Sequence, residues 1–114
     1  MKTLNFLLFL GLVSVSSASA ATVKFNLFTV EVNGVKMWVP STIAVKKGDE
    51  VEIKATNKTA TPGPHGFMLE AFKVVETADE NGKTIKFKAD KAGIFPFQCH
   101  LHPAHVGGQL IVLK

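Results

Sequence analysis

Short runs of alternating apolar and polar residues, separated by turn-forming residues, fill the sequence after its first twenty positions. Alternation with a period of two is typical of a strand with one buried face. No stretch after position 20 repeats apolar residues at helical spacing. Short strands with regularly spaced turns indicate an all-β fold, a Greek-key sandwich or barrel of about seven or eight strands.

The turn signals divide the chain into expected elements. Asn33-Gly34 is the dipeptide of a two-residue hairpin turn between strands at 30–32 and 35–39. The Pro- and Gly-containing stretch 56–64 is expected to be a loop. Further apolar or alternating runs predict strands at 23–27, 43–45, 51–55, 67–72, 85–87, 94–99 and 109–113.

The first twenty residues have the organisation of a secretory signal peptide. Lys2 precedes an apolar run at 4–15, and small residues follow up to Ala20. A membrane anchor is the alternative, but the apolar run is shorter than the roughly 20 residues that span a bilayer. We expect residues 1–20 to be removed, leaving one domain at 21–114 that is periplasmic or secreted and has no membrane anchor.

Charge argues against nucleic acid as a partner. The chain has 13 Lys and Arg residues, all of them lysine, and 9 acidic residues, for a net charge of +4. The lysines are scattered, whereas a nucleic-acid surface gathers its cations. A mildly basic face could meet an acidic redox partner or be merely solvated. The partner's identity is open, and we expect a monomer or a small homo-oligomer.

The cysteine and the histidines carry the strongest functional signal. Cys99 is the only cysteine, so the chain can form no internal disulfide, and three of its four histidines lie within six residues of Cys99. A Cys-x-x-His spacing on a tight loop lets Cys99 and His102 face one metal ion. His105 lies three residues further on, and His65 is the only histidine left to supply a distant nitrogen. A thiolate with imidazoles favours copper.

Three segments give the chain a resemblance to the cupredoxins over residues 21–114. They are the strand-turn-strand segment 40–51, the His65-Gly66-Phe67 segment, and the stretch 87–102, which leads into the Cys-x-x-His loop. The resemblance implies a cupredoxin-type sandwich and one copper ion per chain, cycling between Cu(II) and Cu(I). It places metal ligands at His65, Cys99, His102 and, at the axial position, His105.

The axial position departs from the family pattern. The ligand loop is similar in spacing to that of amicyanin, where Cys-x-x-His-Pro-x is followed by methionine, but here His105 occupies that position. The surroundings are also similar to nitrosocyanin, a red copper cupredoxin. An imidazole binds Cu(II) more strongly than a thioether does, so we expect a lowered reduction potential and a green or red colour. Met68 or a backbone carbonyl is the alternative axial ligand.

Two residues close in sequence to expected ligands, Met68 and His100, are expected to lie outside the metal site. Strand alternation turns Met68 away from His65, and we expect it to pack in the sandwich. The same alternation turns His100 away from the metal, towards the surface or against a ligand.

Three functions are compatible with this pattern. We expect a one-electron carrier rather than an enzyme, because a fourth ligand at His105 fills the open position that catalysis needs. A small copper enzyme acting on nitrogen oxides or peroxide is the alternative, as is copper carriage or sequestration, although no methionine-rich tract is present. One Cys and three His could also form a structural zinc site.

Overall fold

The computed structural model describes residue 11 and residues 21–114. The predicted signal peptide therefore lies, apart from Gly11, outside the described residues, and its removal stays a prediction. Within the described part, no helix is long and apolar enough to cross a membrane.

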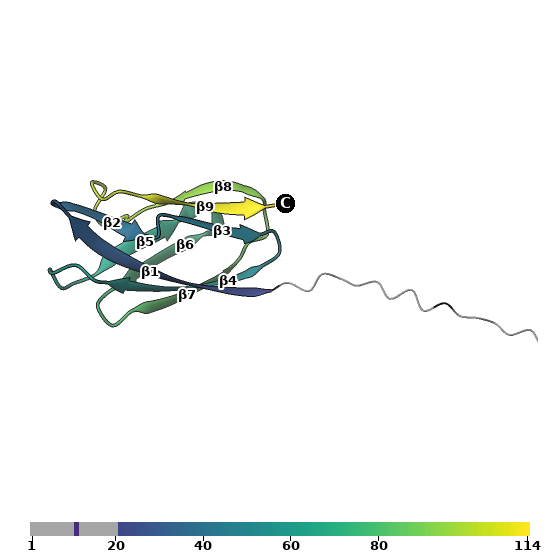
Figure 1. Ribbon diagram of the computed structural model, residues 1–114, viewed down its shortest axis with the longest axis horizontal. Coiled ribbons are helices and arrows are strands. Elements are labelled where there is room, and N and C mark those ends of the chain that lie inside the picture. Colours follow the sequence, from purple (N-terminus) through teal and green to yellow (C-terminus); the bar gives the residue numbers. More distant parts are fainter. Residues whose placement is uncertain (1–10, 12–20) are drawn as a thin grey trace, which may run out of the picture.

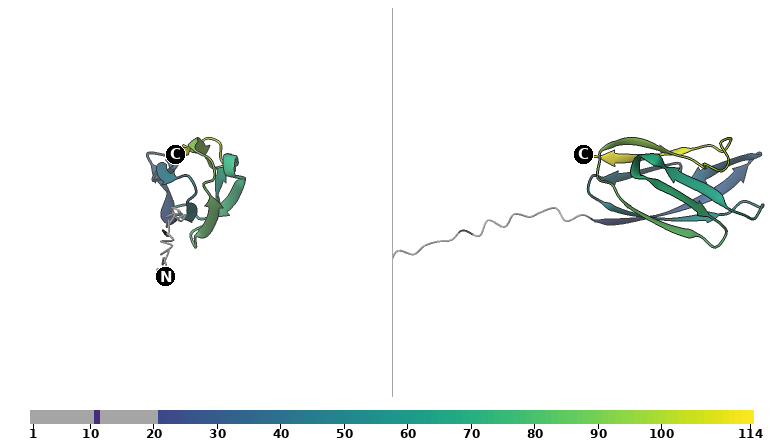
Figure 2. Two further views of the ribbon diagram at one scale, coloured as in Figure 1. Left: turned by 90° about the vertical axis from the view of Figure 1, so that its right-hand side faces the viewer. Right: turned by 180° about the vertical axis from the view of Figure 1, so that it is seen from behind.

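The described part of the chain is a β-sandwich of nine strands with no α-helix. Figures 1 and 2 show two layers of strands packed face to face, without closure into a barrel. The predicted all-β sandwich is confirmed, with one strand more than the upper expectation. The strands are β1 (Thr22–Val32), β2 (Val35–Val39), β3 (Thr42–Lys46), β4 (Glu50–Asn57), β5 (His65–Leu69), β6 (Val74–Ala78), β7 (Lys83–Lys88), β8 (Gly93–Phe97) and β9 (Gly108–Leu113).

The sheets combine local hairpins with pairings between distant parts of the chain. Their strand orders are β2-β1-β4-β7, β3-β9-β8 and β5-β6. Strand β1 runs parallel to β4, and β3 runs parallel to β9, so both pairs need long connections. The β1–β2 hairpin turns at Asn33 and Gly34, both with positive φ (51° and 78°), as a two-residue turn of this kind requires. The hairpin prediction is confirmed.

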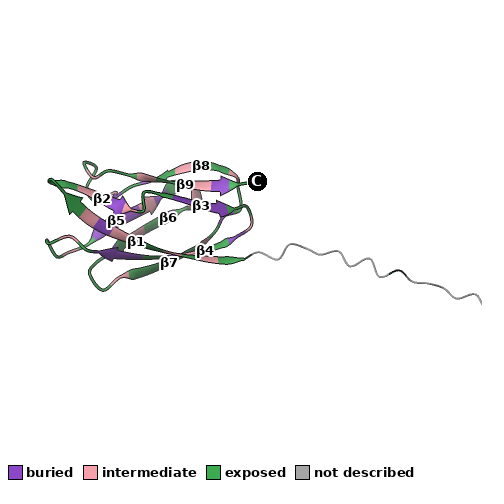
Figure 3. Cartoon of the chain, viewed as in Figure 1, coloured by how far each residue is buried: buried purple, intermediate pink, exposed green. Residues whose placement is uncertain are grey.

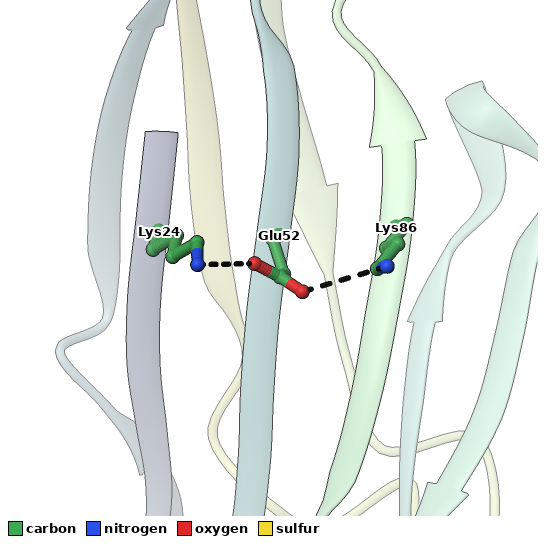
Figure 4. A network of polar contacts seen from close by, with 3 residues as sticks. All are labelled: Lys24, Glu52 and Lys86. Atoms are coloured by element: carbon green, nitrogen blue, oxygen red, sulfur yellow. Dashed lines mark ion pairs between the residues drawn. The ribbon is translucent and has the colours of Figure 1, made fainter. Parts of the chain in front are cut away.

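Three charged residues mark the register on the outer face of the first sheet. Glu52 on β4 pairs in register with Lys24 on β1 and Lys86 on β7. Its carboxylate oxygens lie 3.4 Å from the Lys24 ammonium and 3.7 Å from the Lys86 ammonium (Figure 4). Exposed pairs of this kind contribute little to the free energy of folding, about 0–1 kcal/mol each, but they disfavour a slipped register.

The core lies between the layers and is built from the inward residues of each alternating strand (Figure 3). Trp38, Phe67 and Phe97 are its largest fully buried side chains. The ring centroids of Trp38 and Phe67 are 5.9 Å apart edge to face, and those of Phe67 and Phe97 are 5.1 Å apart. This aromatic layer fixes β2, β5 and β8 relative to one another, and two of these strands lead to the candidate ligands.

The segment between β4 and β7 differs from the expectation. The loop predicted at 56–64 is shorter, because β4 continues to Asn57. The strand predicted at 67–72 ends at Leu69 and is followed by a short 3-10 turn, Glu70–Phe72. The sequence does not predict strand β6. Its outward residue Val75, which is 58% exposed, is apolar and therefore breaks the alternation of apolar and polar residues.

Candidate metal centre

The two segments that carry the candidate ligands lie at one end of the sandwich. His65 begins β5, directly after the loop 58–64, and the ligand loop 98–107 connects β8 to β9. Figures 1 and 2 show both loops at the end opposite the C-terminus. The fold thus places side by side two segments that are more than thirty residues apart in the sequence.

All four predicted ligands converge at this end. Their donor atoms, one nitrogen from each of His65, His102 and His105 and Sγ of Cys99, lie within 4.8 Å of one another. The imidazole centroids are 5.7 Å apart for His65 and His102, 5.3 Å for His65 and His105, and 4.6 Å for His102 and His105. One sulfur and three nitrogens at such spacing form a donor set for a single transition-metal ion.

The ligand loop is shaped by two successive turns. The His102 amide donates to the Cys99 carbonyl at 3.3 Å, and the His105 amide donates to the His102 carbonyl at 3.0 Å. Each turn advances the chain by three residues, so the side chains at 99, 102 and 105 return to one side of the loop. Sγ of Cys99 lies 3.5 Å from Nδ1 of His102. Local turn geometry thus accounts for three of the four donors.

The fourth donor, His65, carries the observation that tests whether a metal fits. His65 is 4% exposed, and its Nδ1 is buried without a hydrogen-bond partner among the described residues. A buried polar atom left unpaired costs about 1–3 kcal/mol, so such atoms are rare in folded proteins. A metal ion bound by this nitrogen would satisfy it, and soft thiolate with neutral imidazole suits copper. The residues present therefore fit a copper ion.

The donors differ in depth. Cys99 is 2% exposed, His105 is half-buried, and His102 is exposed. An ion held here would be enclosed on the side of Cys99 and His65 and would approach solvent on the side of His102.

Asn57 holds the loop that delivers His65. Its Oδ1 accepts hydrogen bonds from the Thr29 hydroxyl and from both the amide and the hydroxyl of Thr59, at 2.7–3.0 Å. Its Nδ2 donates to the carbonyls of Thr61 and Gly63 at 3.1 and 3.0 Å. A single buried amide thus ties the loop 58–64 to β1 and sets the entry into β5.

Asn57→Ala is expected to lower the free energy of unfolding by about 2–4 kcal/mol, because five hydrogen bonds around a buried side chain are lost together. Denaturant unfolding of the metal-free protein measures the loss. Asn57→Asp keeps the acceptor but replaces the donor that reaches Thr61 and Gly63, so it should be destabilised as well. A loss below 1 kcal/mol for the alanine variant would show that the loop holds its shape without this amide.

Two of the imidazoles have lowered pKa values. Burial lowers the pKa of His65 below its usual 6.5, and nearby His105, His102 and Lys36 lower it further. The pKa of His105 is lowered first by burial and then by His102 and Lys36, while Glu31 opposes the shift. Both rings are therefore neutral at pH 7, the state in which imidazole binds metals.

The metal-free domain is expected to lose stability as the pH falls below 6.5. Between the lowered folded-state pKa and the unfolded value of 6.5, the unfolded chain binds more protons at His65 and His105, so acid favours unfolding. Below the folded-state pKa values this loss is complete. Urea midpoints at pH 7.5 and 5.5 measure the effect, and His105→Ala should reduce the difference. If the urea midpoint changed by the same amount between the two pH values in the parent and in His105→Ala, protonation of His105 would not account for the loss of stability.

Met68 and His100 lie outside the donor cluster. Met68 faces away from His65, but it is only half-buried on the outer side of β5, so the expectation that it packs in the core is wrong. The ring of His100 packs against Gly66 and is not among the clustered donors.

Sequence reasoning missed the backbone contacts around Gly66. Its amide donates to Sγ of Cys99 at 3.1 Å, and its carbonyl accepts from Trp38 Nε1 at 3.0 Å. The only sequence signal is a glycine directly after a candidate ligand.

Comparison with known proteins agrees with this fold. The sequence model of the Cupredoxin-like domain family matches residues 4–112, and the chain belongs to this family of copper-binding domains. A comparison with curated protein sequences finds no match.

Three solved structures show the same fold over most of this chain. A copper nitrite reductase from Nitrosomonas europaea has a TM-score of 0.66 and 22% identity, covering 81% of this chain and 41% of its own. The multicopper oxidase mgLAC has a TM-score of 0.65 and 23% identity, and the match covers 82% of this chain and 39% of the oxidase chain. A multicopper oxidase from Pseudomonas thermotolerans has a TM-score of 0.64 and 16% identity, and the match covers 83% of this chain and 30% of the oxidase chain. The chain spans less than half the length of each of these proteins.

Proposed function

We propose that the protein is an exported one-electron carrier that holds a single copper ion between His65, Cys99, His102 and His105. The convergence of these four donor atoms within 4.8 Å of one another, from two separate loops, carries the proposal. Copper bound by thiolate and imidazole exchanges one electron between Cu(II) and Cu(I). The chain's own contribution is to keep the donors in place in both states.

The supports of the donors suit that task. His65 is the first residue of a fully paired strand, and Asn57 fixes the loop before it. Sγ of Cys99 is buried and accepts the Gly66 amide. Because His65 begins a paired strand and the other three donors lie on two successive closed turns, little of the protein needs to move when the charge at the site changes by one.

The exposed side of the site offers a route for the electron. His102 reaches solvent, and the apolar side chains of Leu101 and Val106 in the same loop are 43% and 47% exposed. An exposed apolar surface around a ligand allows a redox partner to approach closely while excluding water. We propose that the electron leaves through His102 and that this surface meets the partner.

A donor at His105 favours a carrier over an enzyme. Three nitrogens and one sulfur would supply four protein ligands, one more than the three that catalytic metal sites with an open position usually have. The imidazole also stabilises Cu(II) relative to Cu(I), so we propose a reduction potential below that of sites with an axial methionine. Export to the periplasm or beyond rests on residues 1–20, which have the signal-peptide pattern.

Copper titration of the purified domain 21–114 tests the proposal. We expect one equivalent of copper per chain, an intense visible band from the thiolate, and rapid electron exchange with a soluble redox dye. Turnover of nitrite, nitric oxide or hydrogen peroxide faster than free copper would instead support an enzyme. Rapid loss of the ion to a chelator would support copper carriage, and tight zinc binding with no visible copper band would support a structural site.

A further inference from the structure

Strand β5 is joined directly to the chain that leads into the ligand loop. Met68 and Gln98 exchange two backbone hydrogen bonds, of 2.8 and 3.0 Å, in an antiparallel bridge. Continuing this register by two residues towards the metal end places Gly66 opposite His100. These two residues each neighbour a donor, since Gly66 follows His65 and His100 follows Cys99.

The contact between Gly66 and His100 is too close for any other residue at position 66. A Cβ atom on Gly66 would lie 2.6 Å from Nδ1 and 2.9 Å from Cε1 of the His100 ring, and 2.9 Å from its backbone nitrogen. Gly66 is not among the glycines with positive φ, so its backbone conformation does not require glycine. The requirement comes from the approach of His100, whose ring covers the bare backbone as aromatic residues do opposite glycine in sheets.

The backbone under the ring carries a hydrogen bond to the metal-binding sulfur. The Gly66 amide donates to Sγ of Cys99 at 3.1 Å, and the Gly66 carbonyl is held by Trp38 at 3.0 Å. Nδ1 of His100 is itself buried and has no hydrogen-bond partner among the described residues. The ring therefore acts on Gly66 by packing and not by a hydrogen bond.

We propose that His100 is a positioning residue, whose ring clamps Gly66 so that the Gly66 amide stays on the Cys99 sulfur and away from water. The expected change in the reduction potential of copper rests on the proposed function. The protection of the Gly66 amide from water does not. A hydrogen bond withdraws charge from the sulfur and favours the reduced state, in which the thiolate keeps more of its charge. Water at the same place would favour the more highly charged oxidised state.

The closing experiment compares three variants of the domain 21–114. His100→Ala removes the ring, His100→Phe keeps an aromatic ring without nitrogens, and Val75→Ala removes an exposed side chain from the same two-stranded sheet as a control. The first readout is hydrogen exchange of the Gly66 amide, measured by NMR in the reduced, metal-free protein. The second is the reduction potential and the energy of the thiolate-to-copper band in the loaded protein.

In His100→Ala we expect Gly66 exchange to be about tenfold faster, as the loss of one protected hydrogen bond implies. The potential should fall and the visible band should move to lower energy. His100→Phe and Val75→Ala should match the unaltered protein in all three measurements. Unchanged exchange, potential and band in His100→Ala would overturn the proposal, and so would a His100→Phe variant that behaves like His100→Ala.

The two readouts separate this proposal from the proposed function. If the protein binds no copper but Gly66 exchange still responds to His100→Ala, the clamp stands and the copper carrier fails. If copper binds with a strong visible band but neither readout responds to His100→Ala, the carrier stands and the clamp fails.

Discussion

Copper-loaded Cys99→Ser is expected to lack the intense visible absorption entirely and to bind copper more than about a hundredfold more weakly. A hydroxyl is a far poorer ligand than a thiolate, and even residues that only support a ligand account for about 10–100-fold in metal affinity. The substitution removes one of four clustered donors and leaves three imidazoles, which are still able to retain copper weakly. Titration monitored by absorption and by a competing chelator measures both effects.

The same variant should lose most of the stabilisation that copper gives. Copper at a thousand times its dissociation constant stabilises the folded state by about 4 kcal/mol, which corresponds to roughly 15–30 °C in the midpoint for a domain of this size. The metal-free variant should unfold close to the metal-free parent, because serine differs little in volume from the buried Cys99. An equal copper-induced shift in parent and variant would exclude Cys99 as a ligand.

His105→Met is expected to move the spectrum towards blue and to raise the reduction potential. The thioether binds Cu(II) more weakly than the imidazole does, so the oxidised state loses more affinity than the reduced state. Each tenfold difference between these losses raises the potential by about 59 mV. Protein voltammetry measures the potential, and electron-spin resonance of the oxidised form should show narrower copper hyperfine splitting.

His105→Ala is the matched control for the axial assignment. His105 is half-buried at the metal end, so a small ligand can reach the position that its ring leaves. Added imidazole should restore the parental spectrum in His105→Ala and have no effect on the parent. A spectrum that is unchanged in both variants would remove His105 from the ligand set.

The sequence alone predicts the features that depend on local pattern. Alternation located most strands, and Asn33-Gly34 fixed the first hairpin, because both signals act over a few residues. Within the site, Cys99, His102 and His105 share one loop, so their spacing could be interpreted directly. His65 was chosen because no other distant histidine exists, and the fold places it within the cluster.

The features that sequence did not indicate all depend on contacts between distant segments. Strand β6 is defined by its pairing with β5, and its outward Val75 obscures the alternation. The close approach of His100 to Gly66 arises from the register across two strands more than thirty residues apart. The half-buried position of Met68 likewise depends on what lies over β5. No local pattern encodes such distances.

The parallel pairing of β3 with β9 has a consequence for how the chain acquires its metal. Residues 42–46 of β3 pair only with residues 109–113 of the final strand, β9, and the ligand loop connects β8 to β9. Folds dominated by such non-local pairings form slowly and late, after long loops have closed. Cys99 is buried in the folded domain but exposed in the unfolded chain, so slow folding lengthens the time in which oxidants can reach its thiol. Copper bound to the thiol during folding would protect it.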